Sequence, residues 1–230
     1  MFKAGIFDLD DTLYNYKKVN EIALNELKKY TYNTLSISTE LFDEAFKYAR
    51  NSTKEVLEEY AAGHNRMIYF QKTLEFLGVN PIEYALEMYE VYWNSLLENM
   101  ELNEGVIELF EYLKNNQIKI AICTDLTTHI QHRKLRKLGI GKYIDCIVTS
   151  EEAGAEKPSI KMFDLCMKKL GISSEEAFYV GDSFKKDIVG ANNAGILPIW
   201  YVKSNEISKK SDFAYKKITK LSQVKEYINY

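Results

Sequence analysis

The 230-residue chain has few of the residues that build disulfide frameworks or zinc centres. It has three cysteines, none of them in a Cys-x-x-Cys pair, and only three histidines. His129 and His132 share one face of an expected helix, but no further ligand accompanies them. The cysteines have mainly apolar neighbours, so we expect small buried side chains rather than nucleophiles or metal ligands.

The chain also lacks a strong excess of charge and a long apolar run. Its formal net charge is −3, so the composition does not predict binding to nucleic acid or to an anionic membrane. No apolar run reaches the ~20 residues of a membrane-spanning helix, and no signal peptide is expected before the first strand. With 46% hydrophobic and 27% charged residues, the composition is that of a globular protein, which we expect in the cytoplasm.

One short stretch places acidic residues at the end of an expected buried strand. The apolar run Ala4–Phe7 is followed at once by Asp8, and Asp10 comes two residues later. Clustered carboxylates repel one another and are costly to desolvate, so stability does not explain them. A Mg²⁺ ion would offset this cost, because it prefers carboxylate and phosphate oxygens. The stretch therefore predicts a Mg²⁺-dependent phosphoryl-transfer site, with a helix cap or an acidic turn as the alternative.

Two kinds of pattern divide the rest of the chain. Residues 14–97 are almost wholly helical, and the first expected helix has four residues on its apolar face: Ile22, Leu24, Leu27 and Tyr30. After residue 102, helices alternate with expected strands at 118–123, 143–148, 177–180 and 198–202, and a further extended piece is expected at 213–214. Strand–helix alternation of this kind predicts an α/β fold with a parallel sheet and right-handed crossovers.

The helical block interrupts the alternating pattern after its first strand. We therefore expect a Rossmann-like core domain of residues 1–14 and 101–230, with an inserted all-helical domain of residues 15–100. Ligands of parallel sheets bind at the carboxyl edge, so the insertion is a candidate lid over that edge. Arg66, at the start of the third inserted helix, is a candidate contact for an anionic or polar part of a substrate. A solvated surface arginine is the alternative.

Further polar signals follow the ends of other expected strands. Thr124 can donate a hydrogen bond to a phosphoryl oxygen, and Lys157 can neutralise phosphate charge in a transition state. Asp182 is a further candidate metal ligand, and Ser183 and Asp187 follow it. Each has an ordinary alternative, as a helix cap, a turn residue or a surface lysine. Their arrival at the same edge of one sheet, in this order, favours a common site.

These motifs resemble those of the haloacid dehalogenase-like (HAD) phosphohydrolases over nearly the whole chain. The run Asp8-x-Asp10-x-Thr12 is similar to the first motif of that family, Thr124 to the second and Lys157 to the third. Residues 181–187, Gly-Asp-Ser-x-x-x-Asp, are similar to the fourth motif. The inserted helices resemble a C1-type cap.

Within the family, residues 151–158 are similar to the branch of nucleotide phosphatases and N-acylneuraminate-9-phosphatases. Many members of this branch have Asn-Gly after the second-motif threonine, where this chain has Asp125-Leu126. The difference adds a carboxylate near the expected phosphate site and makes Asp125 a candidate substrate contact.

The resemblance also implies a mechanism. Asp8 would be the nucleophile that forms an aspartyl-phosphate, and Mg²⁺ would be held by Asp8, Asp182 and the backbone carbonyl of Asp10. The Asp10 side chain would act as general acid and then as general base. Thr124 would orient the phosphoryl group, and Lys157 would neutralise its charge.

Three residues have supporting parts in this scheme. Thr12 would stabilise the loop that carries Asp8. Asp187 would hold either Lys157 or a metal-bound water. Ser183 would either cap the following helix or contact the site.

The most direct function is a Mg²⁺-dependent phosphatase for a small phosphorylated metabolite, either a nucleotide or a sugar phosphate. A phosphomutase of the same family would keep every core residue, so it stays an alternative. A 2-haloacid dehalogenase would need neither Asp10 nor Asp182. A non-enzymatic protein that accepts or binds phosphate is the third alternative. No nucleic acid polymer or membrane partner is expected, and the sequence does not determine the oligomeric state.

Overall fold

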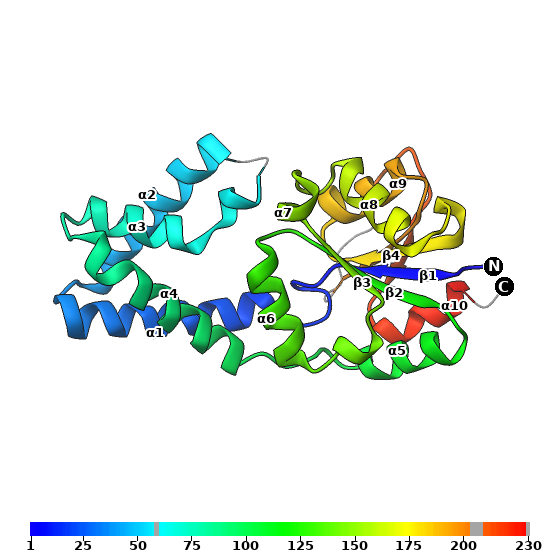
Figure 1. Cartoon of the computed structure of the whole chain (residues 1–230), viewed down its shortest axis with the longest axis horizontal. Helices are drawn as coiled ribbons and strands as arrows, with labels where there is room; N and C mark the ends of the chain where they lie inside the picture. The colour runs from blue at the N-terminus through cyan, green and yellow to red at the C-terminus, as the bar shows by residue number, and fades with distance from the viewer. Residues whose placement is uncertain (58–59, 203–208, 229–230) are drawn as a thin grey trace. The chain divides into compact units, whose positions relative to one another are not determined.

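The computed structural model describes residues 1–57, 60–202 and 209–228, and these fall into two compact units (Figure 1). The core unit consists of Met1–Asn15 and Glu101–Tyr230, and the helical unit of Tyr16–Met100. The chain therefore leaves the core unit after its first strand and returns to it once.

A parallel sheet organises the core unit, with the strand order β3-β2-β1-β4-β5-β6. The six strands are β1 (Ala4–Phe7), β2 (Lys119–Thr124), β3 (Cys146–Thr149), β4 (Ala177–Gly181), β5 (Leu197–Tyr201) and β6 (Lys216–Ile218). Central β1 pairs with β2 and β4, so that Phe7 lies opposite Ile122 on one side and Val180 on the other. This sheet confirms the expected α/β class.

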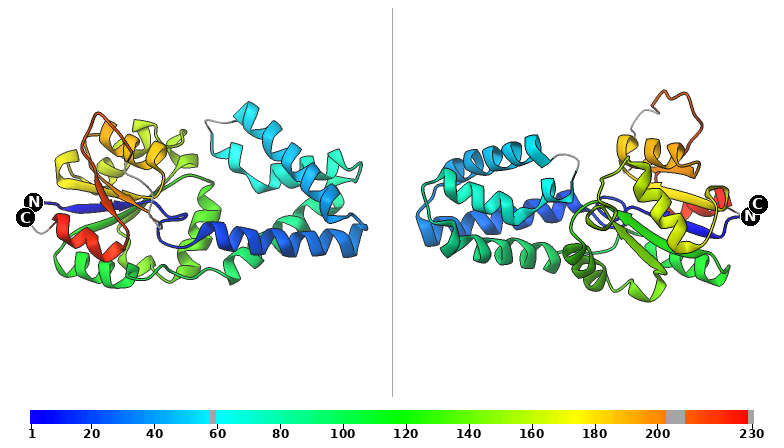
Figure 2. Two further views of the ribbon diagram at one scale, coloured as in Figure 1. Left: turned by 180° about the vertical axis from the view of Figure 1, so that it is seen from behind. Right: turned by 45° about the horizontal axis from the view of Figure 1, so that its top comes forward.

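Helices cover both faces of the sheet because successive strand residues point to opposite sides. The helices of the core unit are α5 (Val106–Asn115), α6 (Thr128–Leu138), α7 (Ser150–Ala153), α8 (Ile160–Leu170), α9 (Val189–Asn193) and α10 (Lys225–Ile228). In β1, Ile6 packs with Phe163 of α8, whereas the Phe7 ring lies 5.1 Å from Phe110 of α5. Figures 1 and 2 show α8 and α9 on one face and α5 and α10 on the other.

The helical unit consists of α1 (Tyr16–Leu35), α2 (Thr39–Leu57), α3 (Arg66–Phe76) and α4 (Pro81–Glu98), with a short 3₁₀ turn, η1, at Ala61–His64. Helix α1 packs on α4, and α3 packs on both α2 and α4. Asparagine caps start the last two helices: the Asn65 side chain accepts from the Met67 N–H, and Asn80 precedes Pro81. In the described part of the chain, no helix is long and apolar enough to cross a membrane.

The apolar face of α1 differs from the one expected from the sequence. Its buried residues are Val19, Ala23, Leu27 and Thr31, whereas Ile22, Leu24 and Tyr30 are only partly buried. Leu27 confirms the expected face in part, and the fully buried row also includes the small Ala23.

Two elements near the carboxyl end also differ from the expected pattern. Strand β6 forms at Lys216–Ile218 rather than at 213–214, and the Phe213 ring packs with its centroid 6.3 Å from that of Phe184. After β4 the chain forms a π-helical turn, η4 (Phe184–Ile188), before the α-helix α9, whereas the sequence pattern of this segment is that of one continuous helix. Turns of this type are rare in proteins, but those that do occur often lie at functional sites.

Close packing of α9 against α8 depends on Gly190. A Cβ atom at Gly190 would lie 2.5 Å from the Phe163 ring and 3.2 Å from the Pro158 Cα. Phe163 is fully buried against Tyr179, with ring centroids 5.2 Å apart, so it cannot move away without disturbing the core.

We expect Gly190→Ala to lower the free energy of unfolding by about 1–3 kcal/mol, as overpacking does in dense cores. Urea unfolding measures this change. Gly141→Ala is the matched control, because no atom lies within 4 Å of its added Cβ. Equal stability of the Gly190→Ala variant and the wild type would contradict the packing constraint.

Candidate active site

Three carboxyl- or hydroxyl-bearing residues lie at the ends of adjacent strands. Asp8 follows β1, Thr124 ends β2, and Asp182 follows β4. The Asp8 backbone N–H donates to the carbonyl of Val180 at 2.9 Å, which holds the nucleophile candidate against β4. The parallel register therefore delivers the three side chains to one edge of the sheet.

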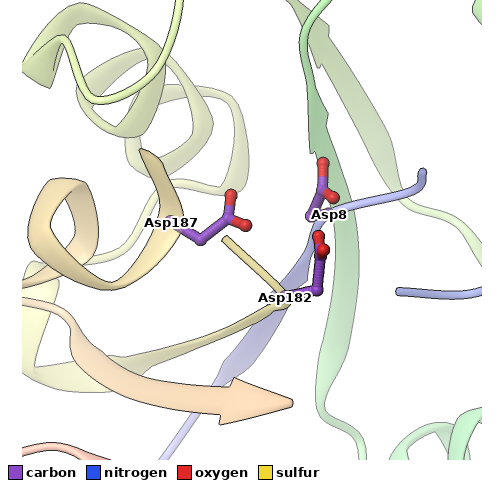
Figure 3. A group of neighbouring side chains, drawn as sticks. All are labelled: Asp8, Asp182 and Asp187. Carbon is purple, nitrogen blue, oxygen red and sulfur yellow. The ribbon is translucent and has the colours of Figure 1, made fainter. Parts of the chain in front are cut away.

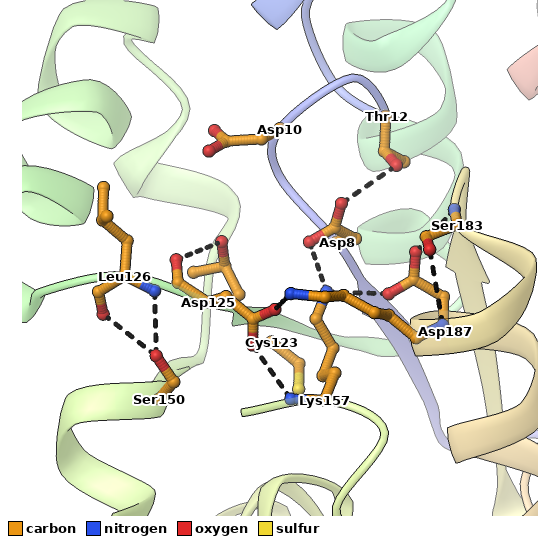
Figure 4. A network of polar contacts seen from close by, with 12 residues as sticks. Asp8, Asp10, Thr12, Cys123, Asp125, Leu126, Ser150, Lys157, Ser183 and Asp187 are labelled. Carbon is orange, nitrogen blue, oxygen red and sulfur yellow. Dashed lines mark hydrogen bonds and ion pairs between the residues drawn. The ribbon is translucent and has the colours of Figure 1, made fainter. Parts of the chain in front are cut away.

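Lys157 connects two of the acidic residues at this edge (Figure 4). Its Nζ donates to Asp8 Oδ1 at 2.6 Å and to Asp187 Oδ1 at 2.7 Å, and all three side chains are buried. Burial by itself lowers the pKa of the Lys157 ammonium, but attraction to Asp187 and Asp8 outweighs it and raises the pKa well above its usual value. Lys157 is therefore a fixed positive charge at the site.

The π-helical turn after β4 positions Asp187. Its Oδ2 accepts from the backbone N–H of Ser183 at 2.9 Å, and the Ser183 hydroxyl accepts from the Lys186 N–H at 3.3 Å. Ser183 thus has the geometry of a helix cap. The last residue of β4 must be glycine here, because a Cβ on Gly181 would lie 2.4 Å from Asp187 Cγ.

The carboxylates of Asp8, Asp182 and Asp187 form an acidic cluster (Figure 3). One oxygen of each lies within 4.8 Å of those of the other two. Burial raises the pKa of the Asp8 carboxyl well above its usual value; the Lys157 cation opposes this rise, and Asp187 and Asp182 add to it. Three oxygen donors that are costly to ionise together fit a hard divalent cation such as Mg²⁺.

The Asp10 carboxylate does not belong to this cluster. It accepts hydrogen bonds from Lys134 Nζ, at 2.8 Å from each oxygen, and from the Tyr14 hydroxyl at 2.6 Å. Figure 4 shows it pointing away from the Asp8 carboxylate. The expected metal contact of Asp10 is its backbone carbonyl, which stays a prediction. Thr12 in the same loop donates to Asp8 Oδ2 at 3.3 Å.

Thr124 is oriented by a residue of α6. Gln131 Nε2 donates to the Thr124 hydroxyl at 2.7 Å and to the carbonyl of Asp125 at 2.6 Å. The Thr124 oxygen is the acceptor in this contact, so its own proton remains available for donation; here it is directed at the Asp125 carbonyl, 3.3 Å away.

Asp125, which was expected as a candidate substrate contact, has protein partners at both oxygens. Oδ1 accepts from the Lys157 backbone N–H at 3.0 Å, and Oδ2 from Lys186 Nζ at 2.8 Å. Burial by itself raises the pKa of Asp125, but the Lys157 and Lys186 cations outweigh it and lower the pKa. Asp125 therefore anchors the loop that carries Lys157.

Leu126 has an unusual backbone conformation for its residue type. Its φ of 101° lies in the region that favours glycine, which is the residue expected here from the family pattern. The Ser150 hydroxyl accepts from the Leu126 N–H at 2.9 Å and holds this turn in place.

Arg66 lies in the helical unit, where its side chain is partly exposed. It donates to the His64 carbonyl at 2.8 Å and to the Tyr16 hydroxyl, and its guanidinium lies over the Tyr69 and Tyr92 rings. Its expected part in substrate binding stays a prediction.

The sequence analysis missed Gln131, Lys134, Tyr179 and Lys186. Gln131 and Lys134 are fully buried polar residues three positions apart on α6, on the side that also buries Leu135. The signal was available: two polar residues interrupt the apolar face of a helix that starts four residues after Thr124.

Comparisons with known proteins agree with this geometry. The pattern of the haloacid dehalogenase-like hydrolases matches residues 5–201. The chain is 37% identical to a ribulose-1,5-bisphosphate 5-phosphatase of Halopiger xanaduensis, over 90% of this chain and 87% of the relative. It is 33% identical to a glyceraldehyde 3-phosphate phosphatase of Methanopyrus kandleri, over 86% and 83% of the two chains.

More distant matches extend the agreement. A pyrimidine 5'-nucleotidase of Escherichia coli, from the branch expected on sequence, is 28% identical over 84% of this chain and 83% of the relative. Among solved structures, a 2-haloacid dehalogenase of Pseudomonas syringae superposes with a TM-score of 0.81 at 23% identity, covering 100% of this chain and 99% of the other. This second likeness concerns the fold alone. The match over residues 5–201 confirms the expected family, and the chain belongs to the haloacid dehalogenase-like hydrolases.

Proposed function

We propose that this protein is a Mg²⁺-dependent phosphatase that hydrolyses a phosphorylated sugar through an aspartyl-phosphate intermediate. The observation that carries the proposal is the contact of buried Lys157 with Asp8 and Asp187, beside the carboxylate of Asp182. In this proposal Asp8 is the nucleophile, Lys157 is the fixed cation and Asp182 is a metal ligand, and their closeness at one edge of the sheet supports a common site.

The names of the relatives support the sugar-phosphate class. Those at 37% and 33% identity are named for ribulose 1,5-bisphosphate and glyceraldehyde 3-phosphate, whereas the nucleotidase is 28% identical. A nucleotide remains the competing substrate class within the same reaction.

Asp8 acts first in the proposed mechanism. Its carboxylate oxygen attacks phosphorus, and the bond from phosphorus to the leaving oxygen breaks as the Asp10 carboxyl gives that oxygen a proton. Lys157 and the Thr124 hydroxyl stabilise the negative charge on the phosphoryl oxygens. A Mg²⁺ ion held by Asp8, Asp182 and the Asp10 carbonyl would supply further charge neutralisation.

Water completes the reaction. The Asp10 carboxylate removes a proton from this water, whose oxygen attacks phosphorus and breaks the bond to Asp8. Inorganic phosphate leaves, and both carboxyl groups return to their starting states. In this scheme Asp187 holds Lys157 in place and does not itself make or break a bond to phosphorus.

Phosphate release from a panel of compounds tests the function. The panel holds ribulose 1,5-bisphosphate, glyceraldehyde 3-phosphate, nucleoside monophosphates, acylneuraminate 9-phosphate and p-nitrophenyl phosphate, each assayed with Mg²⁺ and with chelator. We expect Mg²⁺-dependent release with a sugar phosphate preferred. A nucleotide preference would contradict the substrate class, and no release by folded protein would contradict the phosphatase.

We expect Asp8→Asn to lower kcat by at least about 10³-fold, because the amide is not a competent nucleophile. The fold should be retained, since the two side chains have the same shape and Lys157 keeps its ion pair with Asp187. Steady-state kinetics and thermal melting measure both effects. Asp164→Asn, an exposed change on α8, is the matched control. An Asp8→Asn variant with near-normal turnover would exclude Asp8 as the nucleophile.

We also expect the Mg²⁺ affinity to rise with pH. The pKa of Asp8 is raised in the metal-free protein, so below that pKa a proton occupies the carboxyl and competes with the metal. As pH rises above the ordinary carboxyl range, the half-saturating Mg²⁺ concentration should fall and then level off.

The increase of Tm on adding Mg²⁺, measured across pH, follows this linkage. Asp182→Asn should show a reduced Mg²⁺ effect at every pH, because it removes one charged ligand. A Mg²⁺ affinity of the wild type that does not change with pH would contradict competition at Asp8.

A further inference from the structure

The side chain of buried Lys134 contacts Asp10, the residue proposed as the general acid. Lys134 lies on α6 with no exposed side-chain surface, and its Nζ is 2.8 Å from both Asp10 oxygens. The two residues are 124 positions apart in the sequence. Lys134 is similar to none of the four motifs of the family.

We propose that Lys134 is a positioning residue for Asp10: it holds the Asp10 carboxyl in the orientation from which a proton reaches the leaving oxygen. This inference rests on the proposed function. It adds a residue from α6 to the machinery that handles the leaving group.

The burial of Lys134 is difficult to explain by stability alone. Removing an ammonium from water costs several kcal/mol, and the partner carboxyl of Asp10, with 29% of its side chain exposed, recovers only part of that cost. The surrounding face of α6 already contains apolar residues, Ile130 and Leu135 among them. Among these apolar neighbours, the Lys134 ammonium contacts both oxygens of Asp10 and lies over the Tyr14 ring, 5.8 Å from its centroid, so its charge is directed at the loop of the general acid.

The geometry restrains the carboxyl in two ways. Equal distances from Lys134 Nζ to the two oxygens hold the plane of the group, and the Tyr14 hydroxyl fixes Oδ1 at 2.6 Å. Tyr14 is itself fully buried, so its hydroxyl cannot swing away. Charge-assisted hydrogen bonds of this kind are short and strongly oriented. Small losses of orientation at a reacting group lower rates by up to about 10²-fold.

The leaving group provides a sharp test. An alkyl phosphate, which releases a poor leaving group, needs the Asp10 proton, whereas p-nitrophenyl phosphate releases a stable anion that leaves without one. The ratio kcat/KM reports the steps up to loss of the leaving group, so it isolates the first half-reaction. The alkyl substrate is the one preferred in the phosphate-release panel.

We expect Lys134→Met to lower kcat/KM by about 10- to 100-fold for the alkyl phosphate and by less than about threefold for p-nitrophenyl phosphate. Lys137→Met, the same change on the exposed side of α6, should alter neither value. Thermal melting checks the fold of each variant. An equal loss for both substrates, or no loss for the alkyl phosphate, would overturn the inference.

A double-mutant cycle links the effect to Asp10. Asp10→Asn should show the same dependence on the leaving group, and adding Lys134→Met to it should lower kcat/KM for the alkyl phosphate no further. Additive losses in the double variant would show that Lys134 acts elsewhere and would overturn the inference.

Tyr14→Phe keeps the test decisive if Lys134→Met does not fold. It removes only the hydroxyl contact to Asp10, and the same selective loss for the alkyl phosphate is expected, at a smaller size. A loss that does not depend on the leaving group would overturn the proposed restraint of Asp10.

Failure of the inference can be separated from failure of the proposed function. A wild-type protein that hydrolyses neither substrate refutes the phosphatase and the inference together. A wild type that hydrolyses both, with Asp10→Asn selective and Lys134→Met unselective, refutes the inference alone.

Discussion

The contact of Lys157 with Asp8 and Asp187 is the interaction on which the rest of the site depends. All three side chains are buried, so each charge needs the others: leaving such a charge without its partner costs about 3–5 kcal/mol. The contact also ties together the end of β1, the turn after β4 and the loop before α8. Strand pairing brings two of these segments close, and the ion pairs hold the third against them.

Different residues hold the groups expected to bind phosphate, Lys157 and Thr124, and the group expected to act as general acid, Asp10. On the phosphate side, Asp125 holds the loop of Lys157, and Gln131 directs the Thr124 hydroxyl. On the side of Asp10, the carboxyl is held by Lys134 and lies apart from the acidic cluster. Helix α6 serves both sides, because Gln131 and Lys134 are one turn apart on its buried face. A helix that carries none of the four motifs thus supports two of the groups that the proposed mechanism uses.

The departure from the family pattern at Asp125-Leu126 coincides with specific contacts inside the core unit. Asp125 forms hydrogen bonds inside the core unit, and Leu126 adopts a φ of 101° that Ser150 holds. A glycine would adopt this backbone more readily. The expected part of Asp125 as a substrate contact stays a prediction, as does the source of substrate choice. The helical unit, with Arg66 packed among tyrosines, is where we propose that it resides.

The sequence by itself determined the α/β class, the family and the order of the motif residues along the strand ends, because these follow from local periodicity and from short patterns. It placed Asp8, Thr124 and Asp182 at strand ends that the register brings together. Only the tertiary structure decided which charges meet. Lys134 reaches Asp10 across 124 residues, and Lys157 reaches Asp8 across 149. No periodicity within one element encodes these contacts, since they arise when helices and loops pack on the finished sheet.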